Sequence, residues 1–307
     1  MSFIRASWLL LFACQLHQIQ SDGSVTWPLW SWDSLQSMTF FQGCNATGTE
    51  IAFNETALDV LSRYNVITIE KGQGENSSIP GWYAEDYMLA AAKQIKAVNP
   101  SVQMGYYLNS ALDWTQYRLH YQFLNHSEWW LRNATGAIIR LNGDSHFNNH
   151  TGLLSFDMSN YELTQFWSSS CLNMTDTGYF DSCTIDRVYS WSQGFTGNNT
   201  LSNATDATFD PYKYDTMVAM QRHLNLTANG GPLYINNGFH IPGVNGLTLE
   251  GFQPIEEDIM DLCNRSDGEQ LSIHVHGGYN LAEGCSGQSF VDVLAAYLIG
   301  VQKYQYF

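Results

Sequence analysis

Val66-Ile67-Thr68-Ile69-Glu70 opens the strand–helix–strand unit that indicates the fold of this chain. β-Branched residues dominate this run, as is typical of a buried strand. An amphipathic segment from Tyr83 to Val98 follows, and Asn99-Pro100 is a helix stop signal. Val102 to Leu108 then predicts a second strand directly after that stop. A strand, a helix and another strand in this order are typical of a parallel sheet with helical crossovers.

The same alternation continues along the chain and predicts eight strands. They are expected at Met38–Phe41, Val66–Glu70, Val102–Leu108, Gly178–Asp181, Leu233–Asn236, Leu247–Glu250, Leu271–His276 and Gly300–Phe307. Further helices are expected to start at Asp157–Asn160 and to cover Asp210–Leu224 and Phe290–Leu298. Eight such units predict an α/β protein of the (β/α)8 TIM-barrel class. A doubly wound open sheet is the main alternative, but no G-x-G-x-x-G follows the first strand.

Two expectations concern the ends of the chain. Residues 1–21 resemble a secretory signal peptide, because Arg5 precedes a short apolar run from Trp8 to Cys14. That run is too short to span a bilayer, so no membrane insertion is expected. Residues 22–307 are expected to form a single barrel domain. Because the sequence stops on its eighth strand, we also expect the barrel to lack its final helix or to be truncated.

Asn-X-Ser/Thr acceptors for N-linked glycans run along the whole chain. They are Asn45, Asn54, Asn76, Asn125, Asn133, Asn149, Asn173, Asn198, Asn203, Asn225 and Asn264. A series of this density behind a signal peptide predicts a secreted or extracellular glycoprotein. None of the acceptors coincides with an expected strand end, so a glycan coat is compatible with an open barrel mouth.

The composition of the chain disfavours some classes of binding partner and is compatible with others. The net charge is −16 at pH 7, which argues against nucleic acid and anionic membranes. Aromatic residues make up 14% of the chain, a share that fits carbohydrate binding as well as an ordinary aromatic core. The oligomeric state does not follow from the sequence.

The cysteines predict at most two disulfides in the mature chain. Five remain after Cys14 is removed with the signal peptide. Cys171 and Cys183 flank the expected fourth strand, and Cys263 and Cys285 flank the seventh. A strand separates its two ends by roughly 20 Å, whereas a disulfide needs Cα atoms within about 7 Å. We therefore expect Cys44 to pair with Cys285 or with Cys183.

Polar residues end several of the expected strands, where barrel enzymes place their active sites. Asp181 follows an aromatic strand, although it could instead cap the next loop. Glu250 ends an apolar strand beside Gly251, a setting that suits a proton donor with a burial-raised pKa. A salt bridge is the alternative for Glu250, but few Lys or Arg residues are present to form one.

A second group of strand-end residues could hold a substrate. Its members are Glu70, Lys71, Asn109, Asn236, His274, His276 and Tyr279. Glu70 and Lys71 could also form an ion pair with each other. The alternation in His274-Val275-His276 places both imidazoles on one face of a strand, a spacing that metal hydrolases use. No further ligands complete such a set, so we expect no metal and no organic cofactor.

Four segments together resemble a known group of proteins. They are Ile67–Lys71, Lys96–Asn109, Trp130–Gly136 and Gly178-Tyr179-Phe180-Asp181-Ser182. Their order resembles the hypothetical glycosyl-hydrolase-like TIM-barrel families and, more remotely, the endo-α-1,4-polygalactosaminidases. The resemblance covers about Met38 to Phe307. It implies a glycoside hydrolase barrel with an Asp on strand four and a Glu on strand six as the working pair.

The resemblance matches that pair to Asp181 and Glu250. We therefore expect a secreted hydrolase of O-glycosidic bonds in a polysaccharide or glycoconjugate, with Asp181 as nucleophile or base and Glu250 as general acid. The first alternative is a catalytically inactive glycan-binding barrel. The second is a metal-dependent hydrolase that uses His274.

Overall fold

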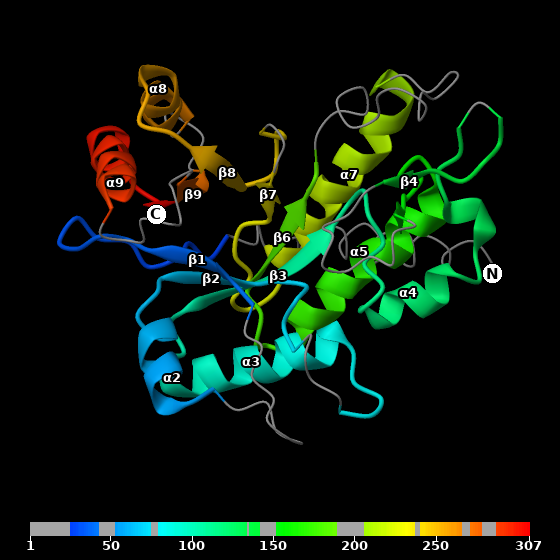
Figure 1. Ribbon diagram of the computed structural model, residues 1–307, viewed down its shortest axis with the longest axis horizontal. Coiled ribbons are helices and arrows are strands. Elements are labelled where there is room, and N and C mark those ends of the chain that lie inside the picture. Colours follow the sequence, from blue (N-terminus) through cyan, green and yellow to red (C-terminus); the bar gives the residue numbers. More distant parts are fainter. Residues whose placement is uncertain are drawn as a thin grey trace, which may run out of the picture.

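The computed structural model describes residues 25–42, 53–74, 79–133, 135–141, 152–188, 206–236, 240–265, 271–277 and 287–307. Eight parallel strands form its main sheet, with helices around the outside (Figure 1). In spatial order they are β1 (Met38–Phe41), β2 (Val66–Ile69), β3 (Gln103–Asn109), β6 (Ser182–Asp186), β7 (Tyr234–Asn236), β8 (Gly246–Phe252), β9 (Ser272–Gly277) and β10 (Gln305–Tyr306). The spatial order equals the chain order, as in a barrel rather than a doubly wound sheet.

Backbone hydrogen bonds join the first and last strands. The Met38 amide donates to the Phe307 carbonyl at 3.0 Å, and the Phe307 amide donates to the Gln36 carbonyl at 3.0 Å. The eight strands therefore form a nearly closed (β/α)8 barrel, which confirms the predicted fold class.

The helices connect successive strands. They are α2 (Glu55–Leu61), α3 (Ala84–Val98), α4 (Arg118–Phe123), the 3₁₀ turn η1 (Ser127–Trp129), α5 (Tyr161–Asp176), α7 (Asp206–Leu224), α8 (Glu256–Arg265) and α9 (Gln288–Gly300). Between β3 and α5, a small hairpin pairs β4 (Arg140–Leu141) with β5 (Leu153–Leu154). No helix in the described ranges has the length and hydropathy that a membrane span requires.

The barrel strands alternate between an apolar outer face and a largely polar inner face. On β2, Ile67 and Ile69 join the main hydrophobic core beneath α3, whereas Thr68 lies inside the barrel. The Thr68 hydroxyl there bonds the Thr184 hydroxyl of β6 at 2.8 Å. A Cβ atom on Gly105 would lie only 2.8 Å from the Thr68 hydroxyl, so a glycine is needed at this point of β3. Both faces of the sheet are buried, as in other parallel barrels.

The fourth strand lies further along the chain than predicted. Helix α5 extends to Asp176, and Gly178 has a φ of +76°, which is the left-handed conformation that ends helices. Gly178 is therefore part of a helix terminus, and the strand begins only at Ser182. The eighth strand is likewise shorter than Gly300–Phe307, because α9 continues to Gly300.

The predicted cysteine pairing is wrong for Cys183. Cys171 of α5 and Cys183 of β6 form a disulfide, with their Cα atoms 6.1 Å apart. Cys183 lies within β6 rather than beyond its end, and α5 packs on the outer face of β3 and β6. The two residues therefore do not lie at opposite ends of a strand. Cys263 is a free thiol, and Cys44 and Cys285 lie outside the described residues.

The expected signal peptide and five of the acceptors, Asn45, Asn76, Asn149, Asn198 and Asn203, also lie outside the described residues. The other six are at least partly exposed: Asn54, Asn125, Asn133, Asn173, Asn225 and Asn264. The last three lie near the C-terminal ends of α5, α7 and α8, which point away from the barrel mouth. Glycosylation at these positions stays a prediction.

Asp181 lies at the end of the barrel opposite to Glu250. Thr184 pairs with Tyr234, and Tyr234 pairs with Gly246. Asp181 therefore lies three residues before this level and Glu250 four residues after it. At about 3.3 Å per residue, roughly 23 Å of strand separates them. The two carboxyl groups cannot act on one bond, so the expectation that Asp181 is the nucleophile or base is corrected.

Asp181 instead ties the bottom of the barrel together. Its carboxylate accepts from the Lys96 ammonium of α3 at 2.7 Å and from the Met104 amide of β3 at 2.7 Å. Burial raises the pKa of Asp181 above its usual range, although Lys96 and the Met104 amide act in the opposite direction. The ion pair is almost fully buried, with 14% and 7% of the two side chains exposed.

Replacing Asp181 is expected to reduce stability. Asp181→Asn leaves the Lys96 ammonium buried without its counter-ion, so we expect a loss of about 3 kcal/mol or more in the free energy of unfolding. Urea denaturation measures this loss. The double variant Lys96→Met/Asp181→Asn carries no buried charge and should recover part of it. Wild-type stability for Asp181→Asn would contradict the structural role.

Candidate active site

Asp186 is the last residue of β6 and lies at the C-terminal face of the barrel. Its backbone is level with that of Asn109, the last residue of β3. Its carboxylate accepts from side chains that include the Tyr107 hydroxyl at 2.6 Å, the Asn109 amide at 3.1 Å and the Asn236 amide at 3.0 Å. Donors from β3 and β7, the strands on either side, thus fix the orientation of this carboxylate.

The Asn236 amide also connects Asp186 to Glu250. Its nitrogen donates to Glu250 Oε2 at 3.1 Å as well as to Asp186 Oδ1 at 3.0 Å. Because both oxygens contact one nitrogen, they lie at most about 6 Å apart. The site therefore contains two carboxylates from the fourth and sixth barrel strands, held by one amide from the fifth.

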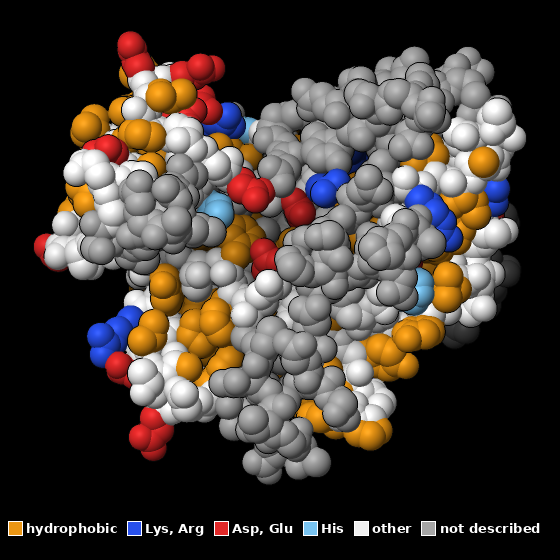
Figure 2. Space-filling view, viewed as in Figure 1, with side chains coloured by type: hydrophobic (Ala, Val, Ile, Leu, Met, Phe, Trp, Pro, Cys, Tyr) orange, Lys and Arg blue, Asp and Glu red, His pale blue; other side chains and the backbone are white. Residues whose placement is uncertain are grey.

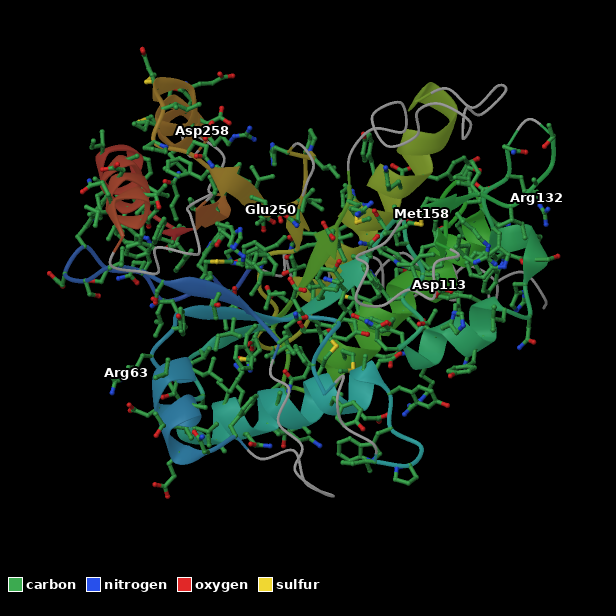
Figure 3. The ribbon with its side chains drawn as sticks, viewed as in Figure 1. Arg63, Asp113, Arg132, Met158, Glu250 and Asp258 are labelled. Atoms are coloured by element: carbon green, nitrogen blue, oxygen red, sulfur yellow. A yellow bond between two sulfur atoms is a disulfide. The ribbon has the colours of Figure 1, made fainter. Side chains whose placement is uncertain are left out.

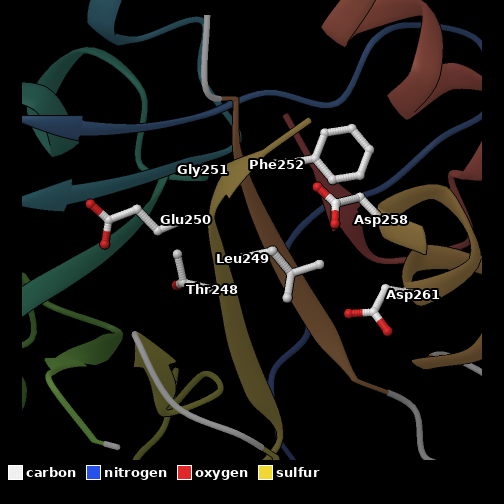
Figure 4. Close-up of a pocket in the computed structure, with 7 residues that line it drawn as sticks. All are labelled: Thr248, Leu249, Glu250, Gly251, Phe252, Asp258 and Asp261. Carbon is white, nitrogen blue, oxygen red and sulfur yellow. The ribbon is translucent and has the colours of Figure 1, made fainter. Parts of the chain in front are cut away.

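The side chain of Glu250 points into the barrel mouth. Figure 4 shows Thr248 and Glu250 on one side of β8 and Leu249 on the other, as strand alternation requires. Asp258 and Asp261 of α8 lie on the Leu249 side and line, together with the end of β8, a pocket of about 250 Å³. Glu250 lies near the middle of the molecule in Figure 3, and acidic side chains gather in the same region of Figure 2.

Tyr107 and Asn109 position the Asp186 carboxylate. Burial and the nearby Asp186 carboxylate raise the pKa of Tyr107 well above 10, so its hydroxyl stays protonated and donates. The Asn109 amide oxygen accepts from the Ala111 and Leu112 amides, which leaves the amide nitrogen facing Asp186. Asn109 is buried and acts through Asp186, whereas direct contact with a substrate stays a prediction.

The sequence allowed Glu70 and Lys71 either to bind substrate or to form an ion pair with each other, and the structure shows the ion pair. The Lys71 ammonium donates to Glu70 Oε2 at 2.7 Å. The same ammonium lies 4.6 Å from the centre of the Tyr107 ring and 5.0 Å from that of Trp114. Because Tyr107 contacts Asp186, the pair borders the active site, and a role in substrate binding stays a prediction for both residues.

The two histidines of β9 lie at different depths. His276 is exposed and level with Glu250, so it lies at the mouth. His274 is completely buried one layer below, level with Thr248, and its ring stacks on Tyr234 with centroids 3.5 Å apart. Tyr279 lies outside the described residues. Within the described ranges, no three His, Cys, Asp or Glu side chains come together as metal ligands.

The sequence interpretation missed Asp186 because it placed the strand too early. Two β-branched residues, Thr184 and Ile185, directly precede the acidic Asp186, and an acidic residue at the end of a strand is the same signal that identified Glu250. Arg187, directly after Asp186, has a φ of +59°, a strained conformation for a residue with a side chain. Such strain is concentrated at functional sites in proteins. It supports the assignment of this strand end to the site.

Comparisons with known proteins identify a family and a shared fold. A model of the hypothetical glycosyl hydrolase family 15 matches residues 96–307. A comparison with curated proteins finds no match. An α-galactosidase from Thermus thermophilus in complex with stachyose has a TM-score of 0.51 at 13% identity, over 91% of this chain and 62% of its own. α-L-Fucosidase isoenzyme 2 from Paenibacillus thiaminolyticus has a TM-score of 0.51 at 13% identity, over 79% of this chain and 40% of its own.

This chain therefore spans less than two thirds of either enzyme. At 13% identity, the structural likeness shows a shared barrel fold and no shared substrate.

The buried His274 predicts a loss of stability in acid. Burial lowers its pKa well below 6.5, so the folded protein holds the ring neutral while the unfolded chain can protonate it. The stability that the neutral His274 ring contributes is therefore fully present above pH 6.5. It is lost as the pH falls below 6.5. The free energy of unfolding should decrease by up to about 1.4 kcal/mol per pH unit from this residue. Urea denaturation at pH 7.5 and 5.5 measures it.

His274→Phe, which keeps a ring against Tyr234, should reduce this pH dependence. Equal slopes for wild type and His274→Phe would contradict the assignment.

Proposed function

This chain belongs to the hypothetical glycosyl hydrolase family 15, and from that premise we propose that it hydrolyses O-glycosidic bonds with Asp186 and Glu250 as its carboxylate pair. The observation that carries the proposal is the Asn236 amide, which holds both carboxylates within hydrogen-bond distance of one atom at the barrel mouth. Two carboxyl groups across the scissile bond are what most glycosidases use. The substrate is a glycan whose sugar and linkage the site alone does not identify.

We assign Glu250 as the general acid and Asp186 as the nucleophile. The Tyr107, Asn109 and Asn236 side chains donate to Asp186 and fix its position, whereas Glu250, which the sequence predicted to be buried, is exposed at the end of β8. In the first step an Asp186 oxygen bonds the anomeric carbon, while the bond to the leaving oxygen breaks and Glu250 protonates that oxygen. In the second step Glu250 takes a proton from water, and the water oxygen displaces Asp186 from the sugar.

Removal of either carboxylate tests the assignment. Asp186→Asn and Glu250→Gln should each lower kcat/KM by about 10²–10⁴-fold, because each removes a group that acts on the reacting atoms. The assay measures hydrolysis of a panel of α- and β-linked 4-nitrophenyl glycosides and oligosaccharides. Asp176→Asn, at the far end of the barrel, is the matched control and should keep wild-type activity.

The folded fraction of Asp181→Asn should also stay active, since Asp181 lies at the bottom of the barrel. If the wild type and both carboxylate variants are equally inert but still bind glycan, the protein is a glycan-binding barrel.

The spacing of the pair supports retention of anomeric configuration. The two bridged oxygens lie at most about 6 Å apart, because each contacts the Asn236 nitrogen. Retaining enzymes place their carboxyl groups about 5–5.5 Å apart, and inverting enzymes need about 6.5–9.5 Å to accommodate a water. Proton NMR of the first product formed should therefore show the anomer of the substrate. The opposite anomer as first product would refute a nucleophilic role for Asp186.

We also propose that the enzyme acts in the secretory pathway or outside the cell. The apolar run near the start of the sequence and the eleven glycan acceptors support this location. The disulfide between Cys171 and Cys183 supports it further, because such bonds persist in oxidising compartments.

A further inference from the structure

A second pocket opens on the same end of the barrel as Asp186. It has a volume of about 230 Å³ and is formed by the segments after β2 and β3 and by the start of α3. We call it the aromatic pocket; its lining includes Lys71, Gln73, Trp82, Tyr83, Gln116 and Tyr121. Segments that follow barrel strands lie at the C-terminal face, so this pocket and the carboxylate pair share one surface.

The lining of the aromatic pocket combines exposed rings with hydrogen-bonding groups. Trp82 and Tyr121 are 39% and 54% exposed, so their rings are accessible to a ligand. The Gln116 amide nitrogen donates to the Lys71 carbonyl at 3.3 Å, whereas its buried amide oxygen has no hydrogen-bond partner among the described residues. Such an acceptor needs a donor, which a sugar hydroxyl would supply. Aromatic walls with a few fixed polar groups are typical of small-molecule sites.

Lys71 connects the aromatic pocket to the carboxylate pair. It lines the pocket, and its ammonium lies 4.6 Å from the centre of the Tyr107 ring. The hydroxyl of the same tyrosine donates to Asp186 at 2.6 Å. The Lys71 ammonium and the Asp186 carboxylate therefore both contact Tyr107, so a ligand that reaches both need extend only a short way across the mouth.

The strand order determines on which side of the scissile bond the aromatic pocket lies. The pocket follows β2 and β3, Asp186 ends β6, and Glu250 lies on β8. The pocket is thus on the side of Asp186 away from Glu250. Since the general acid protonates the leaving oxygen, the leaving group lies toward Glu250. The sugars that precede the scissile bond then extend toward the aromatic pocket.

We infer that the aromatic pocket binds a further sugar unit of the glycone, beyond the one attached to the scissile bond. This inference rests on the proposed function and adds a substrate class to it: chains with at least two sugar units on the glycone side. An enzyme with such a subsite releases glycone products of two or more units and does not simply remove single terminal sugars. Trp82 stacks on the sugar face, and the Gln116 oxygen accepts from a hydroxyl.

Aryl glycosides of increasing glycone length test the subsite. We would assay 4-nitrophenyl glycosides of glucose, galactose and N-acetylglucosamine with one, two or three units, so that the leaving group stays constant. Wild type should prefer two or three units over one. In Trp82→Ala, the ratio of kcat/KM for two or three units to that for one unit should fall by roughly 3–10-fold, the effect of a lost aromatic contact. Trp32→Ala, at an exposed tryptophan far from the mouth, is the matched control.

An unchanged ratio in Trp82→Ala, or no preference for longer glycones in wild type, would overturn the subsite while leaving the proposed hydrolysis intact. Wild type that hydrolyses none of these glycosides would count against the proposed function instead. In that case, calorimetry with maltohexaose, cellohexaose and chitohexaose measures whether the aromatic pocket binds sugar chains. Binding that Trp82→Ala loses and Trp32→Ala keeps supports a sugar site, and no binding, or binding unaffected by Trp82→Ala, refutes it.

Discussion

The alternation of side chains along eight parallel strands is the constraint on which the rest of this structure depends. Most of the residues that face the helices are apolar, and the residues between them face a barrel interior in which polar groups can bond to one another. Lower layers do so with hydroxyl pairs, such as Thr68 with Thr184 and Tyr234 with Ser272. In the layer at the mouth, the same pattern brings amides and carboxylates together. The candidate active site is thus the uppermost layer of a largely polar barrel interior.

Most of the fold could be predicted from the sequence because buried strands and amphipathic helices have different periods. Seven of the eight strands lie at or within a few residues of their predicted positions. The fourth was misplaced because Gly178-Tyr179-Phe180 resembles a short aromatic strand, whereas Gly178 adopts a left-handed conformation that ends α5. Local composition does not distinguish these two uses of a glycine before aromatic residues. Because of the same error, the disulfide between Cys171 and Cys183 was not predicted from the sequence.

The candidate site could be predicted only in part, because it depends on register between distant strands. Glu250 and Asn236 were recognised as polar strand ends, and the structure brings them within 3.1 Å. Asp186 lies 79 residues from Tyr107, whose hydroxyl contacts it. No spacing in the sequence indicates such a contact. An offset of five residues within one strand region moved the expected nucleophile from the mouth to the bottom of the barrel.

The disulfide between Cys171 and Cys183 has a consequence for the carboxylate that lies three residues beyond it. Because successive side chains on a strand point in opposite directions, a shift of β6 by one residue would present Ile185 or Arg187 to the mouth in place of Asp186. The covalent link to α5 opposes such sliding. The disulfide therefore favours the one alignment of the chain in which the proposed nucleophile faces the barrel mouth.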